Sequence, residues 1–233
     1  MSVPYFYEPL IATGMTQFTL SETSSKHCVQ VLRMQEGAKI DITNGMGAVF
    51  NATIQTAHKT NSIVRIQRHQ SVAASQQKIT LGISLLKNAV RLEWLFEKAT
   101  EMGIHQIVPI ICERTIHERF KMDRMQNILQ SAMIQSQQAW LPLLCEPIAL
   151  NTFMQQHKAS VNLIAHCEPS DKKNIKEIVA LEDVNLLIGP EGDFSSSEIA
   201  TAISNNYTPI QLGPTRLRTE TAGIFALSVL KIF

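Results

Sequence analysis

Two short segments of the chain share one arrangement, which suits a small, flat ligand. Residues 188–192 (IGPEG) and 212–216 (LGPTR) each end a predicted strand, continue with Gly-Pro and lead towards a predicted helix. Glycine lets another group approach the backbone closely, and proline stiffens the loop. The pair therefore predicts a rigid pocket lined by backbone groups, the alternative being two ordinary strand-to-helix turns. Neither segment matches the glycine patterns of dinucleotide or nucleoside triphosphate sites.

A charged run follows the second segment. Thr219 is predicted to cap the last helix, and Glu220 in its first turn suits the positive end of the helix dipole. Arg218 has no such explanation, because a cation at a helix N-terminus is unfavourable. It needs either an anionic ligand or an acidic partner, for which Glu191 on the first segment is a candidate.

The elements that must position these residues alternate between strands and helices from Lys78 onward. Strands are predicted over 79–85, 105–111, 161–165, 184–188 and up to 212, and helices over 88–102, 122–138, 173–180, from Ser195 and from 219 to Phe233. A proline-bounded loop is expected at 142–147. This alternation predicts a mostly parallel sheet covered on both faces, whose ligands bind at the carboxyl ends of the strands.

The first part of the chain has a different sequence pattern. Short β-like runs at 38–43, 48–57 and 62–68 are divided by turn residues, and one helix is predicted over 21–33 with Ser21 as its cap. A small β-rich barrel is expected here. The polar stretch 71–77 is interpreted as a linker, which gives domains over residues 1–71 and 72–233.

Composition narrows the class of protein. The chain has 233 residues, of which 45% are hydrophobic and 18% charged, so disordered, collagen-like and coiled-coil architectures are excluded. Lys and Arg number 21 against 20 Asp and Glu, which argues against a strongly basic nucleic-acid binder but leaves room for a local basic patch. Residues 1–71 hold six of the cations against four acids.

Neither the apolar segments, the N-terminus nor the cysteines indicate a membrane segment, a signal peptide or a disulfide framework. The apolar stretch 224–230 is too short to span a membrane, and the N-terminus does not resemble a signal peptide, so a cytoplasmic protein without membrane association is expected. The four cysteines include no CxxC pair, which favours free thiols over a zinc site or a disulfide framework.

Four segments together resemble a known family. Residues 187–194 (LIGPEGDF) with Glu198 resemble IGPEGGF-x-x-x-E, and residues 212–222 (LGPTRLRTETA) resemble LGxxxLRTETA. Residues 98–104 (KATEMGI) with Pro109, Glu113 and Arg114 resemble KATELGV…P…ER, and residues 27–33 (HCVQVLR) with Gly37 resemble HxxxVLRxxxG. The family is the 16S rRNA (uracil-1498-N3)-methyltransferases of the SPOUT superfamily.

The resemblance implies a fold, a cofactor and partners. Residues 1–71 would form a PUA-like β-barrel that binds RNA, and residues 72–233 an α/β SPOUT domain with a deep trefoil knot. S-adenosylmethionine would bind in the knot, and no metal is implied. The substrate would be 16S rRNA of the small ribosomal subunit, and the enzyme would be a homodimer.

The resemblance also implies site residues. The cofactor would be bound by Leu187, Ile188, Gly189, Gly192, Leu212, Gly213 and Leu217. The catalytic residues would be Arg218, Thr219, Glu220 and Glu191. Arg33, Arg114 and Gln135 would contact RNA. Lys39, Arg65, Arg68, Lys87 and Arg91 are further candidates for phosphate contact, although a solvated surface charge is the simpler interpretation of each.

This chain departs from the family pattern at Asp193, at two positions of a further motif on the middle helix, and at residues 4–6, where many members have Arg before the aromatic residue. Asp193 stands where many members have glycine, so the turn there is expected to differ or to have a less extreme φ. Ile134 and Gln138 replace the charged ends of a Glu-Gln-Ser-x-Arg motif, which weakens any role of the middle helix in RNA binding.

The expected reaction moves a methyl group to N3 of a uridine, which becomes nucleophilic only as it loses its proton. Arg218 is suited to stabilising the resulting negative charge, because a guanidinium donates two hydrogen bonds in a fixed fork. Glu220 or Glu191 would accept the proton only if buried, since an ordinary carboxylate is a weak base; otherwise water accepts it. The target base must also be unstacked.

Three other functions compete with this one. Another SPOUT enzyme would methylate tRNA or a ribose 2′-hydroxyl, which also requires deprotonation. A non-catalytic RNA-binding protein would be expected to have decayed cofactor loops, whereas both loops are intact. A small-molecule enzyme would leave the first domain without a purpose.

Overall fold

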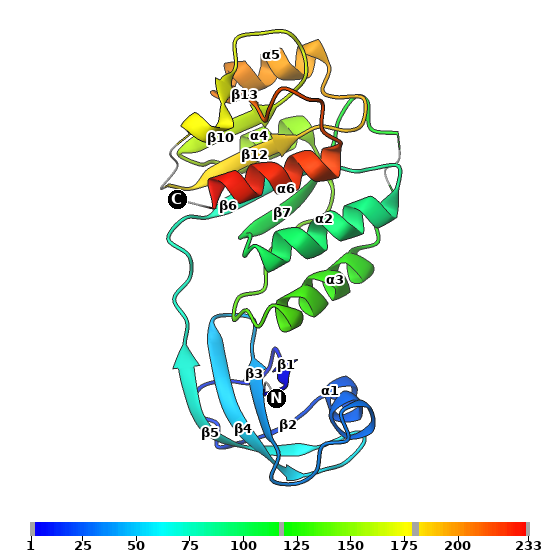
Figure 1. The fold of residues 1–233 in the computed structure, drawn as a ribbon, viewed down its shortest axis with the longest axis vertical. Coiled ribbons are helices and arrows are strands. Elements are labelled where there is room, and N and C mark those ends of the chain that lie inside the picture. The colour runs from blue at the N-terminus through cyan, green and yellow to red at the C-terminus, as the bar shows by residue number, and fades with distance from the viewer. Residues whose placement is uncertain (1–2, 117–118, 179–181, 232–233) are drawn as a thin grey trace. The chain divides into compact units, whose positions relative to one another are not determined.

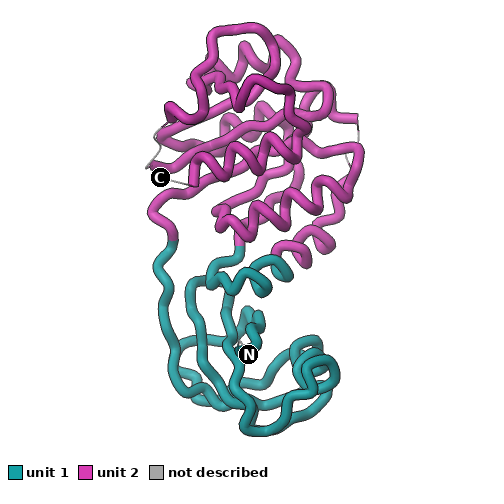
Figure 2. Tube along the Cα trace, in the orientation of Figure 1, with its two compact units in different colours: residues 1–74, 130–141 teal, residues 75–129, 142–233 magenta. Residues whose placement is uncertain are grey.

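The computed structural model describes residues 3–116, 119–178 and 182–231. The chain forms two compact units, shown in Figure 2. Unit 1 comprises residues 1–74 and 130–141, and unit 2 comprises residues 75–129 and 142–233. The expected linker over 71–77 therefore contains the place where the first unit ends, while the segment 130–141 joins unit 1 from the middle of the chain. The domain boundary at 71/72 stays a prediction.

Unit 1 is built on a five-stranded sheet with the order β1-β3-β4-β5-β2. The strands are β1 Tyr5–Tyr7, β2 Gln17–Thr19, β3 Lys39–Thr43, β4 Ala48–Thr56 and β5 Ile63–Ser71. All neighbours are antiparallel except β1 and β3. Alternate residues of β3 and β4, such as Ile40, Ile42 and Phe50, form the core, because successive side chains of a strand point to opposite faces. The expected barrel is thus a half-barrel with an outward face.

The helix predicted over 21–33 is present but divided. Ser21 caps α1 (Glu22–Lys26) by accepting a hydrogen bond from the Ser24 backbone N–H, as expected. A π-helical turn, His27–Val31, continues α1, and Arg33 has a φ of +52°. A left-handed residue ends the turn, which explains why the helix is shorter than its pattern.

Unit 2 contains an eight-stranded sheet in which every strand pairing is parallel. Its main order is β11-β13-β10-β12-β6-β7-β8, with β9 beside β7. The strands are β6 Ile79–Ser84, β7 Gln106–Ile111, β8 Leu143–Leu144, β9 Ile148–Ala149, β10 Val161–Ala165, β11 Lys173–Asn174, β12 Val184–Ile188 and β13 Thr208–Gln211. The expectation of a mostly parallel sheet is confirmed.

Helices cover both faces of this sheet (Figure 1). The helices that follow β6 are α2 Ala89–Glu101, α3 Met122–Gln135, α4 Leu150–Gln156, α5 Ser196–Ser204 and α6 Thr219–Leu230, and the last residues of α3 belong to unit 1. A Cβ placed at Gly223 of α6 would meet Leu95 of α2 and Ile83 of β6, so α2 and α6 share one face. A Cβ at Gly82, the neighbour of Ile83, would meet Phe153 of α4 and Leu187 of β12, which places α4 on the other face.

Two local predictions are wrong. The segment 173–180 is not a helix: Lys173–Asn174 form β11 and Ile175–Glu177 form a short 3₁₀ turn, because Ile175 is buried and the Asn174 side chain accepts from the Lys176 N–H. Residues 179–181 lie outside the described residues. Thr219 does not cap α6; Arg218 is the N-cap and its side chain makes no capping hydrogen bond.

The predicted loop over 142–147 contains the short strand β8, and α4 was not predicted at all. The Ser195 capping box is confirmed, since Ser195 and Glu198 exchange hydrogen bonds with each other's backbone N–H groups. Phe233, the expected end of α6, lies outside the described residues. The trefoil knot stays a prediction. Within the described residues, no helix is long and apolar enough to cross a membrane.

Candidate active site

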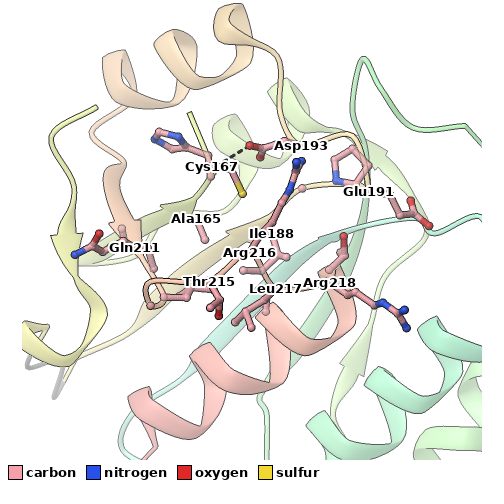
Figure 3. A pocket seen from close by; sticks show the side chains of 18 of the residues that line it. Ala165, Cys167, Ile188, Glu191, Asp193, Gln211, Thr215, Arg216, Leu217 and Arg218 are labelled. Carbon is pink, nitrogen blue, oxygen red and sulfur yellow. Dashed lines mark hydrogen bonds between the residues drawn. The ribbon is translucent and has the colours of Figure 1, made fainter. Parts of the chain in front are cut away.

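The two Gly-Pro loops lie at the same edge of the sheet in unit 2. β12 ends at Ile188 and β13 at Gln211, and both strands pair with β10 in parallel. Their following loops therefore flank the loop that leaves β10 after Ala165 (Figure 3). These three loops line a cavity of about 650 Å³, a size typical of small-molecule and cofactor sites.

Asp193 holds the first loop in place. Its φ of +64° is left-handed, a conformation that aspartate adopts more readily than most residues. One carboxylate oxygen accepts the Cys167 backbone N–H at 2.7 Å, and the other accepts the Phe194 N–H at 2.9 Å. The side chain thus joins the loop after β12 to the loop after β10. These hydrogen bonds stabilise the left-handed turn at Asp193, and whether the turn differs from that of relatives with glycine stays a prediction.

Two further side chains fix the same loop from a neighbouring segment. The Arg114 guanidinium donates to the carbonyl oxygens of Gly192, at 2.9 Å, and Phe194, at 3.2 Å. The Glu198 carboxylate accepts the N–H groups of Glu113 and Ser195. The first loop is therefore tied on both sides, and Gly189 and Pro190 within it are buried.

The second loop is open by comparison. Residues 213–216 and Arg218 are exposed. Among the described residues, Arg216 and Arg218 form no ion pair or side-chain hydrogen bond, and Glu191 accepts the Lys87 N–H instead of pairing with Arg218. The expected Glu191–Arg218 pair is therefore not formed. Arg218 keeps an unneutralised guanidinium beside the N-terminus of α6, which is the arrangement that calls for an anionic ligand.

Glu220 is paired with a residue that was not predicted as part of the active site. Glu220 is 8% exposed, and its carboxylate lies 3.6 Å from the guanidinium of Arg91 on α2. Arg91 also lines the cavity. Arg91 therefore offsets the charge of this buried carboxylate.

The structure brings most of the predicted site residues together. Those lining the cavity are Ile188, Gly189, Glu191, Leu212, Gly213, Leu217, Arg218 and Thr219. Leu187 does not line it, because its side chain belongs to the core on the α4 face. Gly192 lies outside the lining beneath Arg114, and Glu220 lies behind Thr219 in the first turn of α6.

The predicted RNA contacts are divided between the two units. Arg114 lies in unit 2 and holds the first loop, whereas Arg33 and Gln135 are exposed in unit 1. Their roles in RNA binding stay predictions.

The loop after β10 supplies cavity residues that sequence reasoning missed, among them His166 and Cys167. His166 is 7% exposed, and its two ring nitrogens have no hydrogen-bond partner among the described residues. Burial lowers the pKa of His166, and nearby Lys172 lowers it further. The signal that could have found them is their position, directly after a predicted strand at the edge where ligands bind.

The lining suits a flat cofactor with a polar tail. Apolar side chains from the ends of three strands, Ala165, Ile188 and Leu212, face backbone groups of the Gly-Pro loops. A Cβ at Gly213 would meet no atom within 4 Å, so the glycine leaves open space where a side chain would project. Within the described ranges, no cluster of three or more His, Cys, Asp or Glu could hold a metal ion.

The fold and the site define a parallel α/β domain with a cofactor-sized cavity at its strand ends, in a chain that also has a small β unit. The family described as "RNA methyltransferase domain" matches residues 73–231, and that described as "RNA methyltransferase PUA domain" matches residues 20–67. The chain belongs to this RNA methyltransferase family.

Individual relatives agree along nearly the whole chain. A ribosomal RNA small subunit methyltransferase E from Synechocystis is 28% identical, over 90% of this chain and 71% of its own. The structure of a Legionella pneumophila methyltransferase with bound SAM is 33% identical, with a TM-score of 0.89 over 99% of this chain and 97% of its own. A Neisseria gonorrhoeae ribosomal RNA small subunit methyltransferase E bound to S-adenosylmethionine is 26% identical, with a TM-score of 0.87 over 97% and 96%.

Proposed function

We propose that this chain transfers a methyl group from S-adenosylmethionine to N3 of a uridine in 16S rRNA, at the position that the family resemblance gives as 1498. The observation that carries the proposal is the unpaired Arg218 at the mouth of a cofactor-sized cavity, in a chain of the RNA methyltransferase family. The similarity to ribosomal RNA small subunit methyltransferases E supports ribosomal RNA of the small subunit as the substrate.

The two Gly-Pro loops bind the cofactor. Ile188, Leu212 and Leu217 offer apolar surface, Gly189 lines the cavity, and Gly213 leaves open space beside its backbone. S-adenosylmethionine, when bound, supplies an electrophilic methyl group on a sulfonium centre. The tied first loop holds its side of the cavity fixed, so little ordering is needed when a ligand enters.

Arg218 stabilises the charge that appears on the uridine as N3 loses its proton. That charge spreads over N3 and the two carbonyl oxygens, and a guanidinium can donate two parallel hydrogen bonds to such a group. Since no carboxylate among the described residues neutralises Arg218, its donors are available. Thr219, buried beside it, adds a hydroxyl that lines the same cavity.

Glu220 is the proton acceptor that burial favours. It is shielded from water, whereas Glu191 is exposed and is engaged by the Lys87 N–H. Arg91 lies 3.6 Å from the Glu220 carboxylate and holds it beside the cavity that Arg91 lines. Water remains the alternative proton acceptor. A Glu220→Gln variant distinguishes the two, because loss of turnover supports Glu220 and retained turnover supports water.

The proposed enzyme works on the small ribosomal subunit in the cytoplasm, as a homodimer. Support for a second copy comes from α2, where Val90 is 69% and Trp94 43% exposed one helical turn apart. Two large apolar side chains on one helix face suit an interface between copies. Sedimentation of the purified protein tests this directly.

The decisive experiment is mass spectrometry of rRNA nucleosides from a strain that lacks this gene. We expect 3-methyluridine to disappear from 16S rRNA and to return when purified protein and S-adenosylmethionine are added to the mutant's small subunits. Fragmentation separates a methyl on the base from one on the ribose. A lost 2′-O-methyl group, or a change confined to tRNA, would replace the proposal by one of its competitors.

A further inference from the structure

A second cavity lies at the edge of the unit 2 sheet where its strands begin, and the proposed reaction does not use it. β6, β7 and β12 run parallel, so the segments that precede them meet at one edge, while the cofactor cavity lies at the other, where the strands end. The second cavity measures about 220 Å³. Its lining combines the start of these strands with the residues that follow α4, and we call it the amino-edge cavity.

A row of polar side chains crosses the sheet beside this cavity. Register pairs Asn162 with Asn185, Asn185 with Thr80, and Thr80 with Gln106, and directly paired residues share a face. The last three line the cavity. The Asn185 amide donates to Asn162 at 2.9 Å, and both Asn185 and Thr80 are buried. Two residues further along the strands, the same face belongs to the apolar core that packs against α4, so only this end of the face suits a polar ligand.

Four side chains around the cavity hold hydrogen-bond donors that the fold leaves unused. Lys78 and Lys158 form no ion pair in the described part of the chain. Lys158 donates to the Met154 carbonyl at 2.9 Å, which leaves two of its three donors. The ring nitrogens of His105 and His157 make no hydrogen bond within the described residues. The C-terminus of α4 accounts for a cation at Lys158, but not for Lys78 and His105, which come from other segments.

Asp183 is the single acid in the described lining, and its carboxylate is engaged. It accepts the Lys78 backbone N–H at 3.0 Å. The lining therefore holds two lysines and two histidines against one carboxylate. Burial lowers the pKa of both His105 and His157; at His105, Lys78 and Lys231 add to this shift and Asp183 opposes it. A negative charge in the cavity would favour the protonated form of both rings.

We propose that the amino-edge cavity binds a tetrahedral oxyanion of the phosphate class. Its donors are Lys78, Lys158, His105 and His157, which come from the segments before β6, before β7 and after α4. Donors from three segments approach one anion from several sides, and a phosphate offers several acceptor oxygens.

The alternatives fit this cavity less well. Within the described ranges, no group of three or more His, Cys, Asp or Glu could hold a metal ion. An apolar molecule would leave the polar row and the lysines without partners. The inference goes beyond methyl transfer and does not depend on it.

Histidine NMR gives the direct test, with sulfate as the probe. Sulfate has the shape of phosphate but keeps its charge over the useful range, whereas a phosphate group titrates at about pH 6. Sulfate replaces chloride at constant ionic strength, so that general screening stays the same. We expect the ring signals of His105 and His157, assigned with His105→Gln and His157→Gln, to follow one saturating curve. Exposed His58 in unit 1 should not follow it, and an unsaturating drift of all histidine signals together would overturn the proposal.

Proton linkage gives a second readout. Binding should raise the pKa of both imidazoles, and each unit of rise strengthens binding by about tenfold once the ring is protonated. Sulfate affinity should therefore be at least about threefold higher at pH 6 than at pH 8. Calorimetry at the two pH values measures this, and equal affinity would contradict the assignment of the imidazoles as donors.

Charge-neutral variants test the two lysines. Lys78→Gln and Lys158→Gln should each weaken sulfate binding about three- to tenfold, as expected for a charge-assisted hydrogen bond at an exposed position. Both side chains are exposed, and Lys78→Gln keeps the backbone N–H that donates to Asp183, so the fold should persist. Lys26→Gln, on α1 in unit 1, is the matched control and should leave sulfate affinity unchanged. Wild-type affinity in both lysine variants would overturn the proposal.

Competition separates the two sources of a phosphate group. Inorganic phosphate and an oligoribonucleotide without terminal phosphates are each added to the sulfate complex. Displacement by inorganic phosphate alone identifies a free anion as the occupant, and displacement by the oligoribonucleotide identifies a backbone phosphate of RNA. If neither displaces sulfate, the cavity is not a phosphate site and the proposal fails. None of these readouts depends on methyl transfer, so the proposed function is tested separately.

Discussion

The two Gly-Pro loops begin with the same three kinds of residue and yet behave differently in the folded chain. The loop after β12 is buried at Gly189 and Pro190 and is tied by Asp193, Arg114 and Glu198. The loop after β13 is exposed, and its arginines have no partner among the described residues. The loop after β12 therefore shapes the cavity, whereas the loop after β13 keeps its arginine side chains available to a ligand.

The largest effect is expected at the open loop. Arg218→Ala should reduce single-turnover methyl transfer by about 100-fold or more, since one lost donor to a developing negative charge has effects of that size. Calorimetric affinity for S-adenosylmethionine should stay within a few-fold, and thermal stability should not fall, because Arg218 is exposed and unpaired in the described structure.

Arg218→Lys is the matched control. Lysine keeps the charge but not the planar fork, so we expect it to recover only part of the rate. Unchanged turnover in Arg218→Ala would remove Arg218 from the reaction. A lower melting temperature would show that the arginine serves the fold, and the contrast between the loops would then disappear.

Substitutions in the loop after β12 should mainly lower the stability of the fold. Asp193→Ala loses two carboxylate hydrogen bonds and leaves alanine at a φ of +64°, so the free energy of unfolding should fall by about 2 kcal/mol. Urea denaturation measures this. Asp193→Asn tolerates the same φ and keeps one acceptor, and it should lose less. Equal stability of Asp193→Ala and wild type would mean that the loop is not held by this side chain.

A smaller effect, on the pH dependence of stability, is expected from His166 in the loop after β10. Burial and Lys172 lower the pKa of His166 in the folded chain, while Asp193 and Glu168 oppose the shift. The unfolded chain then binds the proton first, near the ordinary histidine value of about 6.5. Stability should therefore be fully present above about pH 6.5 and decline as the pH falls towards the lower folded value.

His166→Gln should flatten part of that decline, as measured by urea denaturation between pH 5 and pH 8. Burial lowers the pKa of His105 and His157 as well, so part of the dependence should remain. An identical pH profile in wild type and His166→Gln would show that His166 is not a neutral buried imidazole.

Sequence patterns were most informative where local chemistry dominates. Ser21 and Ser195 cap the helices that they were predicted to cap, and β10 and β12 have the predicted limits. Predictions failed where packing overrides local preference. At residues 173–177, burial of Ile175 and pairing of Lys173 with β13 outweighed the helical pattern. The exposed Trp140 attracted no prediction, because its surroundings come from distant β strands.

The sequence by itself determined the family, the alternation of strands and helices, and the identity of the two Gly-Pro loops, because these depend on residue types at short spacing. Tertiary structure decided which residues meet. It paired Glu220 with Arg91 instead of linking Arg218 to Glu191, placed Leu187 in the core, and buried His166 without a partner. Such outcomes depend on which strands become neighbours in the sheet. The spacing of residues along the chain does not determine that order.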